Sequence, residues 1–311
     1  MGISEAMARR KRTSCREVNG ILLLDKPGGM TSNAALQQVK RLYRACKAGH
    51  TGSLDPLATG LLPICMGEAT KMSAFLLEAD KRYHATLKLG VRTVTGDSQG
   101  EVIGRRPVPR LDEGALESAL ETLRGRIEQT PPMHSAVKRN GVPLYKLAHQ
   151  GIEVERTPRE VTVYDLEIIA RTEDRLELAI HCSKGTYVRT LADDLGERLG
   201  CGAHVVALRR LGVGGFDGRG MSTIEELSAL AEEGPAALDG QLLAMETGVE
   251  QWPDVRLNAD AAYFLRQGQA VFVPHAPTCG LVRIYAGEGR FLGVGHILDD
   301  GRVAPKRLVS C

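Results

Sequence analysis

The stretch from Gly49 to Pro63 carries the residue best suited to chemistry in this sequence, a carboxylate on a loop that glycines interrupt. Asp55 lies shortly after Gly52 and directly before Pro56. A backbone of this kind can adopt the unusual dihedral angles that catalytic loops often need. The same Ser-x-Asp-Pro pattern is also common in ordinary turns. The loop by itself therefore leaves open both a catalytic carboxylate and a simple turn.

Cofactor-binding patterns do not accompany this loop. The sequence has no G-x-x-x-x-G-K-[ST] run, and its two glycine clusters miss the dinucleotide fingerprint because Asp217 and Leu292 stand where the third glycine is needed. The seven cysteines are scattered without a C-x-x-C pair. This arrangement argues against a disulfide framework or a thiolate zinc site and favours a reducing compartment.

The elements before and after the loop can be predicted from hydrophobic patterns. The run from Ile21 to Leu24 predicts a buried strand that ends at Pro27. Thr31 and Ser32 are good helix caps, and the apolar residues behind them recur on one helical face. Further strands are predicted over residues 83–89 and 176–182, and further helices over residues 116–123 and 190–199, with a capping box of Ser222 and Glu225 before another helix.

The order of these elements predicts the fold class. Strands and helices are mixed without a regular βαβ alternation, which favours an α+β fold with a largely antiparallel sheet. After about Thr247 the pattern changes to short strand-like pieces between Gly, Pro and Asp-Gly turns, at residues 271–273, 281–285 and 291–297. We therefore predict a basic, disordered tail over residues 1–18, a catalytic domain over 19–247 and a small β-rich domain over 248–311.

Positive charge is clustered in this chain although the formal net charge is only +2. Such clusters can neutralise the phosphates of a nucleic acid, and they are equally typical of solvated tails. No apolar stretch approaches the length of a membrane span, and no secretory signal follows the basic N-terminus. We therefore expect a cytoplasmic protein. The clustered cations are Arg9, Arg10, Lys11, Arg12, Arg16, Lys40, Arg41, Arg44 and Lys47.

Several motifs together resemble one known family. Read in order, they are Gly20-Ile-Leu-Leu-Leu-Asp-Lys-Pro27, Gly49-His-Thr-Gly-Ser-Leu-Asp-Pro-Leu-Ala-Thr-Gly60, Thr93-x-Thr-x-Asp-x-x-Gly100, Cys182-Ser-Lys-Gly-Thr-Tyr-Val-Arg-Thr190 and Leu208-Arg-Arg-Leu211. Their order and spacing resemble the TruB family of tRNA pseudouridine synthases from about residue 19 to 247. The stretch from Leu281 to Leu308 resembles the RNA-binding PUA-like domain of the bacterial members. The chain departs from the family at His134, where Tyr is common, and at Lys146, where Glu is common.

The resemblance implies a fold and an activity. The fold would be a pseudouridine-synthase core, and the enzyme would isomerise the uridine at position 55 in the T-loop of tRNA after flipping that base out of the stack. This isomerisation moves no electrons to an acceptor and uses no phosphate, so no cofactor and no metal are expected. The bacterial-looking C-terminal region implies a monomer that needs no guide RNA and no protein partner.

The resemblance also assigns roles to individual residues. Asp55 matches the catalytic aspartate, because breaking a glycosidic bond builds positive charge on the sugar that a carboxylate can stabilise or capture. Arg189 matches the arginine that pairs with this aspartate and orients it. Tyr83 matches the tyrosine that stacks on the target base and takes part in proton removal at C5.

Three further residues match positions around the substrate. His50 matches a residue beside the place that the flipped nucleotide vacates, and Tyr187 and Leu208 match residues around the uracil. Taken without the family, His50 would be an ordinary loop histidine and Leu208 an ordinary core leucine.

Three other functions are alternatives to this interpretation. A non-catalytic RNA-binding protein would not need Asp55, Tyr83 and Arg189 together. The archaeal and eukaryotic branch of the same family works with guide RNA and accessory proteins. A glycoside hydrolase would need a second acid near the first, and the sequence does not decide whether one is close. The candidates for that second acid are Asp25, Glu68, Asp80 and Asp97.

Overall fold

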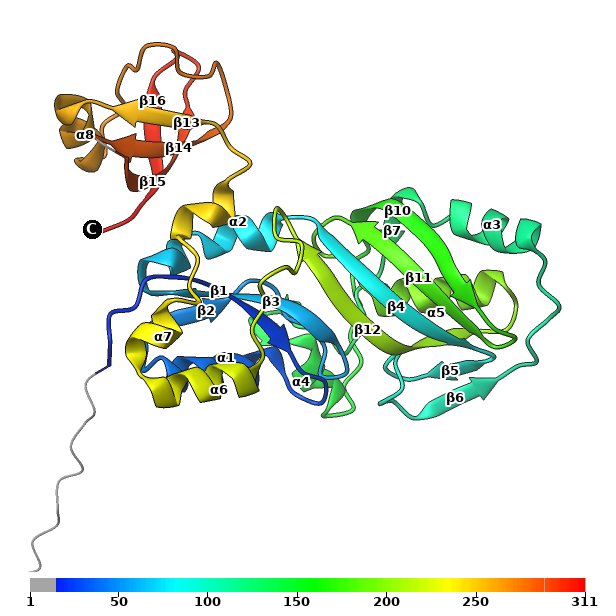
Figure 1. Ribbon diagram of the computed structural model, residues 1–311. Coiled ribbons are helices and arrows are strands. Elements are labelled where there is room, and N and C mark those ends of the chain that lie inside the picture. The colour runs from blue at the N-terminus through cyan, green and yellow to red at the C-terminus, as the bar shows by residue number, and fades with distance from the viewer. Residues whose placement is uncertain (1–14, 288, 311) are drawn as a thin grey trace, which may run out of the picture.

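A mixed sheet forms the frame of the larger part of the molecule (Figure 1). The computed structural model describes residues 15–287 and 289–310. Within these residues the sheet has eight strands, all paired antiparallel except β12 with β3. The predicted α+β fold with a largely antiparallel sheet is confirmed. In order across the sheet the strands are β1 (Gly20–Lys26), β3 (Thr59–Met66), β12 (Ala203–Val213), β4 (Lys81–Leu89), β11 (Arg175–Cys182), β10 (Arg159–Arg171) and β7 (Gly125–Gln129), with β2 (Ala48–His50) paired to β3.

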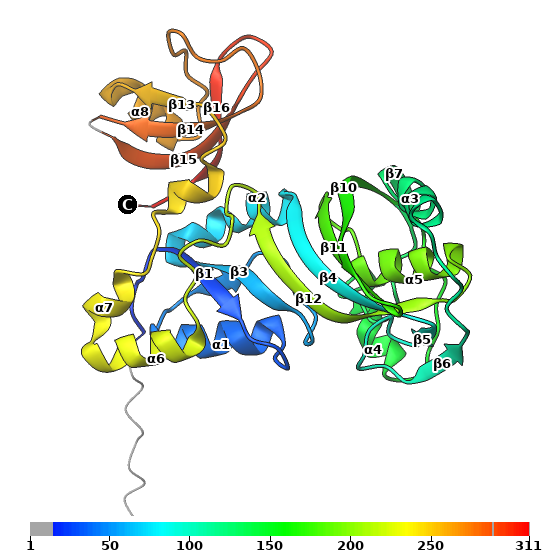
Figure 2. The same cartoon turned by 45° about the vertical axis from the view of Figure 1, so that its right-hand side comes forward.

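Helices flank this sheet in two groups (Figures 1 and 2). Near β1 and β3 lie α1 (Ser32–Leu42), α6 (Ile224–Glu233) and α7 (Pro235–Asp239). At the far end, near β10 and β11, lie α3 (Glu113–Glu121) and α5 (Val188–Arg198). One apolar core contacts both groups, because Leu22 of β1, Val39 of α1 and Leu195 of α5 belong to the same buried cluster. The remaining elements are η1 (Gly67–Lys71), α2 (Ser73–Glu78), β5 (Val91–Thr93), β6 (Val102–Arg105), β8 (Lys138–Arg139), β9 (Val142–Pro143), α4 (Leu144–Ala148) and η2 (Met245–Val249).

The helices predicted over residues 116–123 and 190–199 form as α3 and α5, which begin two or three residues earlier and end one or two residues earlier than predicted. Thr31 caps α1, because its hydroxyl accepts a hydrogen bond of 3.1 Å from the Ala34 amide. The capping box of α6 consists of Thr223 and Glu226, one residue later than predicted. Ser222 cannot cap the helix because its backbone pairs with β1, where its amide donates to the Leu23 carbonyl over 2.9 Å.

The predicted disordered tail, residues 1–18, overlaps the described part of the chain at residues 15–18. Residues 1–14, which include four of the clustered cations, lie outside the described part of the chain. From Cys15 onwards the chain packs on the end of α1: the Arg16 amide donates to the Arg44 carbonyl over 2.7 Å, and a disulfide joins Cys15 to Cys46. The expectation of no disulfide framework therefore needs a correction. The two cysteines are 31 residues apart, and tertiary contacts that the sequence pattern does not encode bring them together.

The C-terminal part is β-rich, as predicted. It contains β13 (Asp254–Leu257), α8 (Ala259–Arg266), β14 (Leu281–Ala286), β15 (Arg290–Ile297) and β16 (Val303–Leu308), which form one sheet and a helix around their own apolar core. Residues 271–273 do not form the strand that we predicted; only Val271 makes an isolated bridge, to Val303. No helix in the described residues is long and apolar enough to cross a membrane.

Candidate active site

The loop that carries Asp55 connects β2 to β3, and hydrogen bonds from α1 and the segment before it hold the backbone of this loop. Ser32, the first residue of α1, donates from its hydroxyl to the Leu54 carbonyl over 3.1 Å and accepts from the Leu54 amide over 2.7 Å. The Gly29 amide donates to the Pro56 carbonyl over 2.8 Å. Gly52 has a φ of +93°, a left-handed conformation that favours glycine. The sequence motifs around residues 27–32 and 49–60 thus build one structure, a rigid support for Asp55.

Arg189 holds the carboxylate of Asp55. Its Nη2 donates to Oδ1 over 3.0 Å, and its Nε lies 2.8 Å from Oδ2 without hydrogen-bond geometry. The same guanidinium donates over 2.8 Å to the carbonyls of Thr95 and His134, so its position is fixed from three sides. The arginine side chain is 5% exposed and that of Asp55 is 33% exposed. The anion therefore remains reachable, whereas its counterion is buried.

The environment opposes the charge on Asp55. Burial raises the pKa of the Asp55 carboxyl above its usual value, Arg189 counters this effect, and the nearby Asp97 carboxylate adds to it. Asp97 is itself 4% exposed and accepts hydrogen bonds from the Thr95 hydroxyl (2.6 Å) and the Gln99 amide (3.0 Å). A second acid thus lies near Asp55. It is buried and hydrogen-bonded within the fold, which disfavours the glycoside hydrolase alternative.

Tyr83 lies on β4, beside the same loop. The sheet register places it directly opposite Arg210 of β12, and the Arg210 guanidinium is close enough to lower the pKa of the Tyr83 hydroxyl. Asp55 is close enough to influence the pKa of the Tyr83 hydroxyl, which burial raises. The tertiary structure therefore brings together Asp55, Tyr83 and Arg189, which are far apart in the sequence.

The other three predicted residues lie around this group. His50 ends β2, and its Nδ1 is buried without a hydrogen-bond partner in the described structure. Tyr187 is the N-cap residue of α5, and its amide donates a hydrogen bond of 2.9 Å to Gln129 Oε1. Leu208 is 7% exposed and lies on β12 opposite Ala85, two residues before Arg210.

Sequence reasoning gave no role to two buried cations beside the loop. Lys26 is fully buried and donates from Nζ to the carbonyls of Pro27 (2.8 Å) and Met30 (2.6 Å). Burial lowers the pKa of Lys26 to about 8, although the Asp55 charge acts in the opposite direction. Arg210 is 1% exposed. Both residues lie inside motifs noted above, but hydrophobic periodicity predicts apolar residues at buried strand positions and so gave no sign of them.

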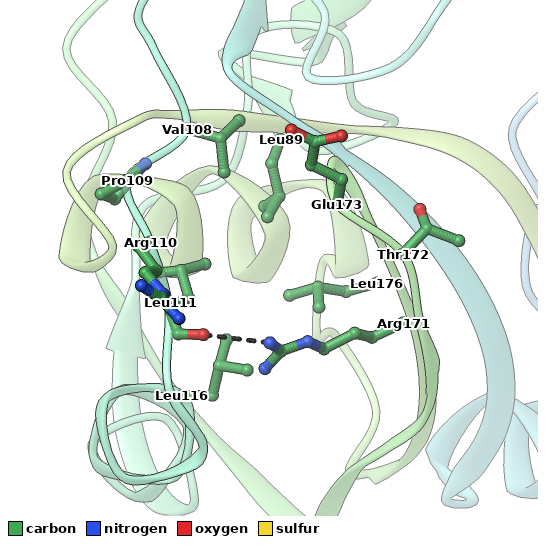
Figure 3. Close-up of a pocket in the computed structure, with 10 residues that line it drawn as sticks. All are labelled: Leu89, Val108, Pro109, Arg110, Leu111, Leu116, Arg171, Thr172, Glu173 and Leu176. Carbon is green, nitrogen blue, oxygen red and sulfur yellow. Dashed lines mark hydrogen bonds between the residues drawn. The ribbon is translucent and has the colours of Figure 1, made fainter.

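A cavity of about 300 Å³ lies elsewhere, where the loop between β10 and β11 approaches α3 (Figure 3). Its floor is apolar, and the Arg171 guanidinium at its side donates to the Leu111 carbonyl over 3.0 Å. It shares no lining residue with the group around Asp55. In the described part of the chain, no group of three or more His, Cys, Asp or Glu side chains could hold a metal ion.

A buried arginine paired with a reachable aspartate, on a loop beside a mixed sheet, can be compared with known proteins. Three family models match in succession: "TruB family pseudouridylate synthase (N terminal domain)" over residues 40–188, "tRNA pseudouridylate synthase B C-terminal domain" over 189–250, and "Pseudouridine synthase II TruB, C-terminal" over 253–309. A chain in the crystal structure of a Cbf5-Nop10-Gar1 complex has a TM-score of 0.72 and 25% identity, and the match covers 94% of this chain and 84% of that one.

Fold and site together define a pseudouridine synthase, an isomerase. Two curated relatives are both named tRNA pseudouridine synthase B. The protein of Coxiella burnetii (strain RSA 493) is 57% identical over 95% of this chain and 96% of its own length, and that of Nitrosococcus oceani is 55% identical over 97% and 98%. The chain belongs to the TruB family. The resemblance seen in the sequence is thereby confirmed.

Proposed function

We propose that this protein converts uridine to pseudouridine at position 55, in the T-loop of tRNA. As a member of the TruB family it is a tRNA pseudouridine synthase; the position and the roles of the residues are the proposal. The observation that carries it is the pair of Asp55 and Arg189, in which a reachable carboxylate is held by a buried guanidinium.

The reaction requires a base that has left its stack. The N1–C1′ bond breaks, the freed uracil turns, and C1′ bonds to C5; the proton on C5 leaves and N1 gains one, so the product is an isomer. Both C1′ and the faces of the uracil are out of reach in a stacked loop, so the nucleotide must flip into the site. Asp55 then lies beside the sugar, where a carboxylate stabilises the positive charge or bonds to C1′.

Arg189 would keep Asp55 ionised and oriented for this step. Burial raises the pKa of the carboxyl, and a guanidinium at 3.0 Å counters that effect directly. The three carbonyl and carboxylate partners of the arginine support a fixed orientation. Tyr83 would stack on the uracil and take part in removing the proton from C5.

The remaining predicted residues would shape the space for the nucleotide. We assign His50 to the position that the flipped nucleotide vacates. Burial and the nearby Arg210 charge lower the pKa of His50, which supports a neutral imidazole there. Tyr187 and Leu208 would line the uracil pocket, one as the residue that caps α5 and the other from β12.

We further propose the domain division and the mode of action. Residues 19–247 would form the catalytic domain and 248–311 a PUA-like domain that contacts RNA, which exposed aromatic residues such as Phe272 (73%) and Tyr263 (62%) support. The enzyme would act as a monomer in the cytoplasm without guide RNA or a protein partner. That the family models match nearly the whole chain supports a self-sufficient enzyme.

An unmodified tRNA transcript tests the proposal. The purified protein, without guide RNA, is incubated with the transcript, and pseudouridine is mapped by carbodiimide-dependent primer-extension stops. A stop that marks position 55, absent from a transcript with cytidine there and absent with Asp55→Asn, is the expected result. Modification only at another position, or only after a second RNA is added, would refute the assignment.

A further inference from the structure

Arg210 is an unusual residue for the centre of a sheet. Among the described residues it is the largest side chain that is fully buried, with 1% exposure. No carboxylate of the described residues lies within ion-pair distance of it. Taking a cation out of water is costly, and natural proteins usually compensate by pairing it with an anion. A buried guanidinium without such a partner therefore points to a role beyond packing.

The contacts of Arg210 join three elements of the site. Its Nε donates to the Leu61 carbonyl of β3 over 2.7 Å, and its Nη2 donates to the Gly52 carbonyl of the catalytic loop over 3.2 Å. The third element is β4, on which the sheet register places Tyr83 directly opposite Arg210, and the guanidinium acts on the charge of the Tyr83 hydroxyl. One planar group thus fixes the tyrosine oxygen relative to the loop that carries Asp55.

The backbone around Arg210 allows β12 to lie close to β3. β12 runs parallel to β3 here, with Arg210 in register with Gly60. A Cβ at Gly60 would lie 2.3 Å from the Arg210 carbonyl oxygen, so a larger residue would force the strands apart. Gly52, whose carbonyl accepts from the guanidinium, also needs its left-handed conformation.

Arg210 also dominates the charge around the Tyr83 oxygen. Burial raises the pKa of the Tyr83 hydroxyl, and Arg210 is the main influence that lowers it. The other charged or titratable groups that face the hydroxyl are Cys182 from β11 and Asp55 from the loop, and both act to raise that pKa. The guanidinium is therefore the group that makes the buried oxygen better able to exist without its proton.

We propose that Arg210 is a positioning residue for the isomerisation: it fixes the Tyr83 oxygen against the Asp55 loop and supplies the positive charge beside it. This inference rests on the role proposed above for Tyr83. Arg210 touches neither the sugar nor the base and acts through the tyrosine. A packing role alone would be served by an apolar side chain, whereas this role requires both the charge and the planar set of donors.

The test is a double-mutant cycle with single-turnover rates. Arg210→Gln keeps hydrogen-bond donors and removes the charge, and Arg210→Lys keeps the charge and removes the planar fork. Each is combined with Tyr83→Phe, which removes only the hydroxyl oxygen. Rates are measured on tRNA as a function of pH, filter binding gives tRNA affinity, and thermal melting checks the fold.

Arg210→Gln is expected to slow the reaction about tenfold or more, as loss of a preorganised charged donor does, because the positive charge that favours the ionised Tyr83 hydroxyl is removed. The rate of this variant should rise at a higher pH than the rate of the wild type does. Its affinity for tRNA should stay within about twofold of the wild-type value. In the Tyr83→Phe background the same substitution should change the rate by less than about twofold. Arg210→Lys should slow the reaction without moving the pH profile.

Equal losses from an Arg210 substitution in both backgrounds would overturn the proposal, as would an unchanged rate and pH profile. If Arg210→Gln does not fold, the cycle with Arg210→Lys decides, because loss of the planar fork should still depend on the tyrosine hydroxyl. A normal rate for Tyr83→Phe would refute the role of Tyr83 and this inference with it. If Tyr83→Phe is slow and the losses from the Tyr83 and Arg210 substitutions are additive, the role proposed for Arg210 is refuted while that of Tyr83 stands.

Discussion

At the scale of single residues, opposing effects act on the protonation of the Asp55 carboxyl. Burial and the Asp97 carboxylate favour its protonated form, whereas Arg189 favours the anion. A carboxylate that must act as an anion in a partly dry site needs such a counterion close by. The buried guanidinium also donates hydrogen bonds to the Thr95 and His134 carbonyls. The charge and the geometry of the site therefore depend on the same side chain.

Replacing Asp55 by Asn separates catalysis from binding. The substitution keeps the size of the side chain and removes its charge and basicity. We expect the single-turnover rate to fall by ~10²–10⁴ or more, as for positioned acid–base groups. Affinity for tRNA should remain, or rise slightly, because an anion facing a polyanion is removed. Filter binding and quench-flow rates check this, with the exposed Glu232→Gln as control; a near-normal rate for Asp55→Asn would exclude it from the mechanism.

The pH dependence of the rate should report the raised pKa of Asp55. A carboxyl with a raised pKa takes up its proton earlier as the pH falls, so the anion and the activity are lost above the usual carboxyl range of about pH 4. Arg189→Gln should move this loss to still higher pH, since the counterion lowers that pKa. Single-turnover rates from about pH 4.5 to 7.5, with binding measured in the same buffers, test it. A flat profile over this range contradicts the expectation.

At the scale of elements, the site depends on where β3 and β12 meet. These are the only strands of the described eight-stranded sheet that pair in parallel. Gly60 makes their close approach possible, with a φ of +96° and a position directly beside the Arg210 backbone. Both strands position residues of the site: β3 directly follows the loop that carries Asp55, and β12 contains Leu208 and Arg210.

Gly60→Ala should therefore destabilise the catalytic part strongly. A Cβ at 2.3 Å from a backbone oxygen cannot be relieved by moving a side chain, and the left-handed φ adds strain. Overpacking and the conformational cost together predict a loss of about 3 kcal/mol or more. Urea unfolding measures this loss, with Gly104→Ala on β6, where nothing lies within 4 Å, as the matched control. Equal stabilities of the two variants would refute the close approach.

At the scale of the whole molecule, one apolar cluster attaches the C-terminal part to the rest of the chain. The C-terminal part has its own core around Leu265 and Ile284, and the separate cluster joins it to α2 and η2. In that cluster the Phe75 and Trp252 rings meet edge to face with centroids 4.9 Å apart. Truncation near residue 247 would expose this cluster, so surface substitutions are a cleaner test of RNA contact.

Neutralising exposed cations of the C-terminal part should weaken tRNA binding and its salt dependence. Lys306→Gln with Arg307→Gln removes two charges on β16 that are exposed to solvent. Each lost phosphate contact reduces the slope of log affinity against log salt by ~0.7–0.9. Filter binding at several salt concentrations measures the slope, and Arg126→Gln is the control, because Arg126 is an exposed cation on β7 of the catalytic part. An unchanged slope for the double variant would count against an RNA-contacting role of β16.

The sequence by itself determined most elements and the family. The continuous apolar run of β1, the alternation in β4 and the Thr31 cap of α1 are local patterns, so they could be predicted from local rules. The ordered motifs identified the TruB resemblance, which named Asp55, Tyr83 and Arg189 as site residues. Only their meeting at one place, across 134 residues in the case of Asp55 and Arg189, had to come from the tertiary structure.

Only the tertiary structure decided the features that depend on distant contacts. Ser222 is drawn into pairing with β1, which moved the α6 cap by one residue, and Cys15 meets Cys46 because the segment before β1 packs on α1. Arg210 and Lys26 occupy buried positions where periodicity predicts apolar side chains. Hydrophobic patterns report which side chains avoid water, whereas a buried cation is stabilised by carbonyl groups that other strands and loops bring to it.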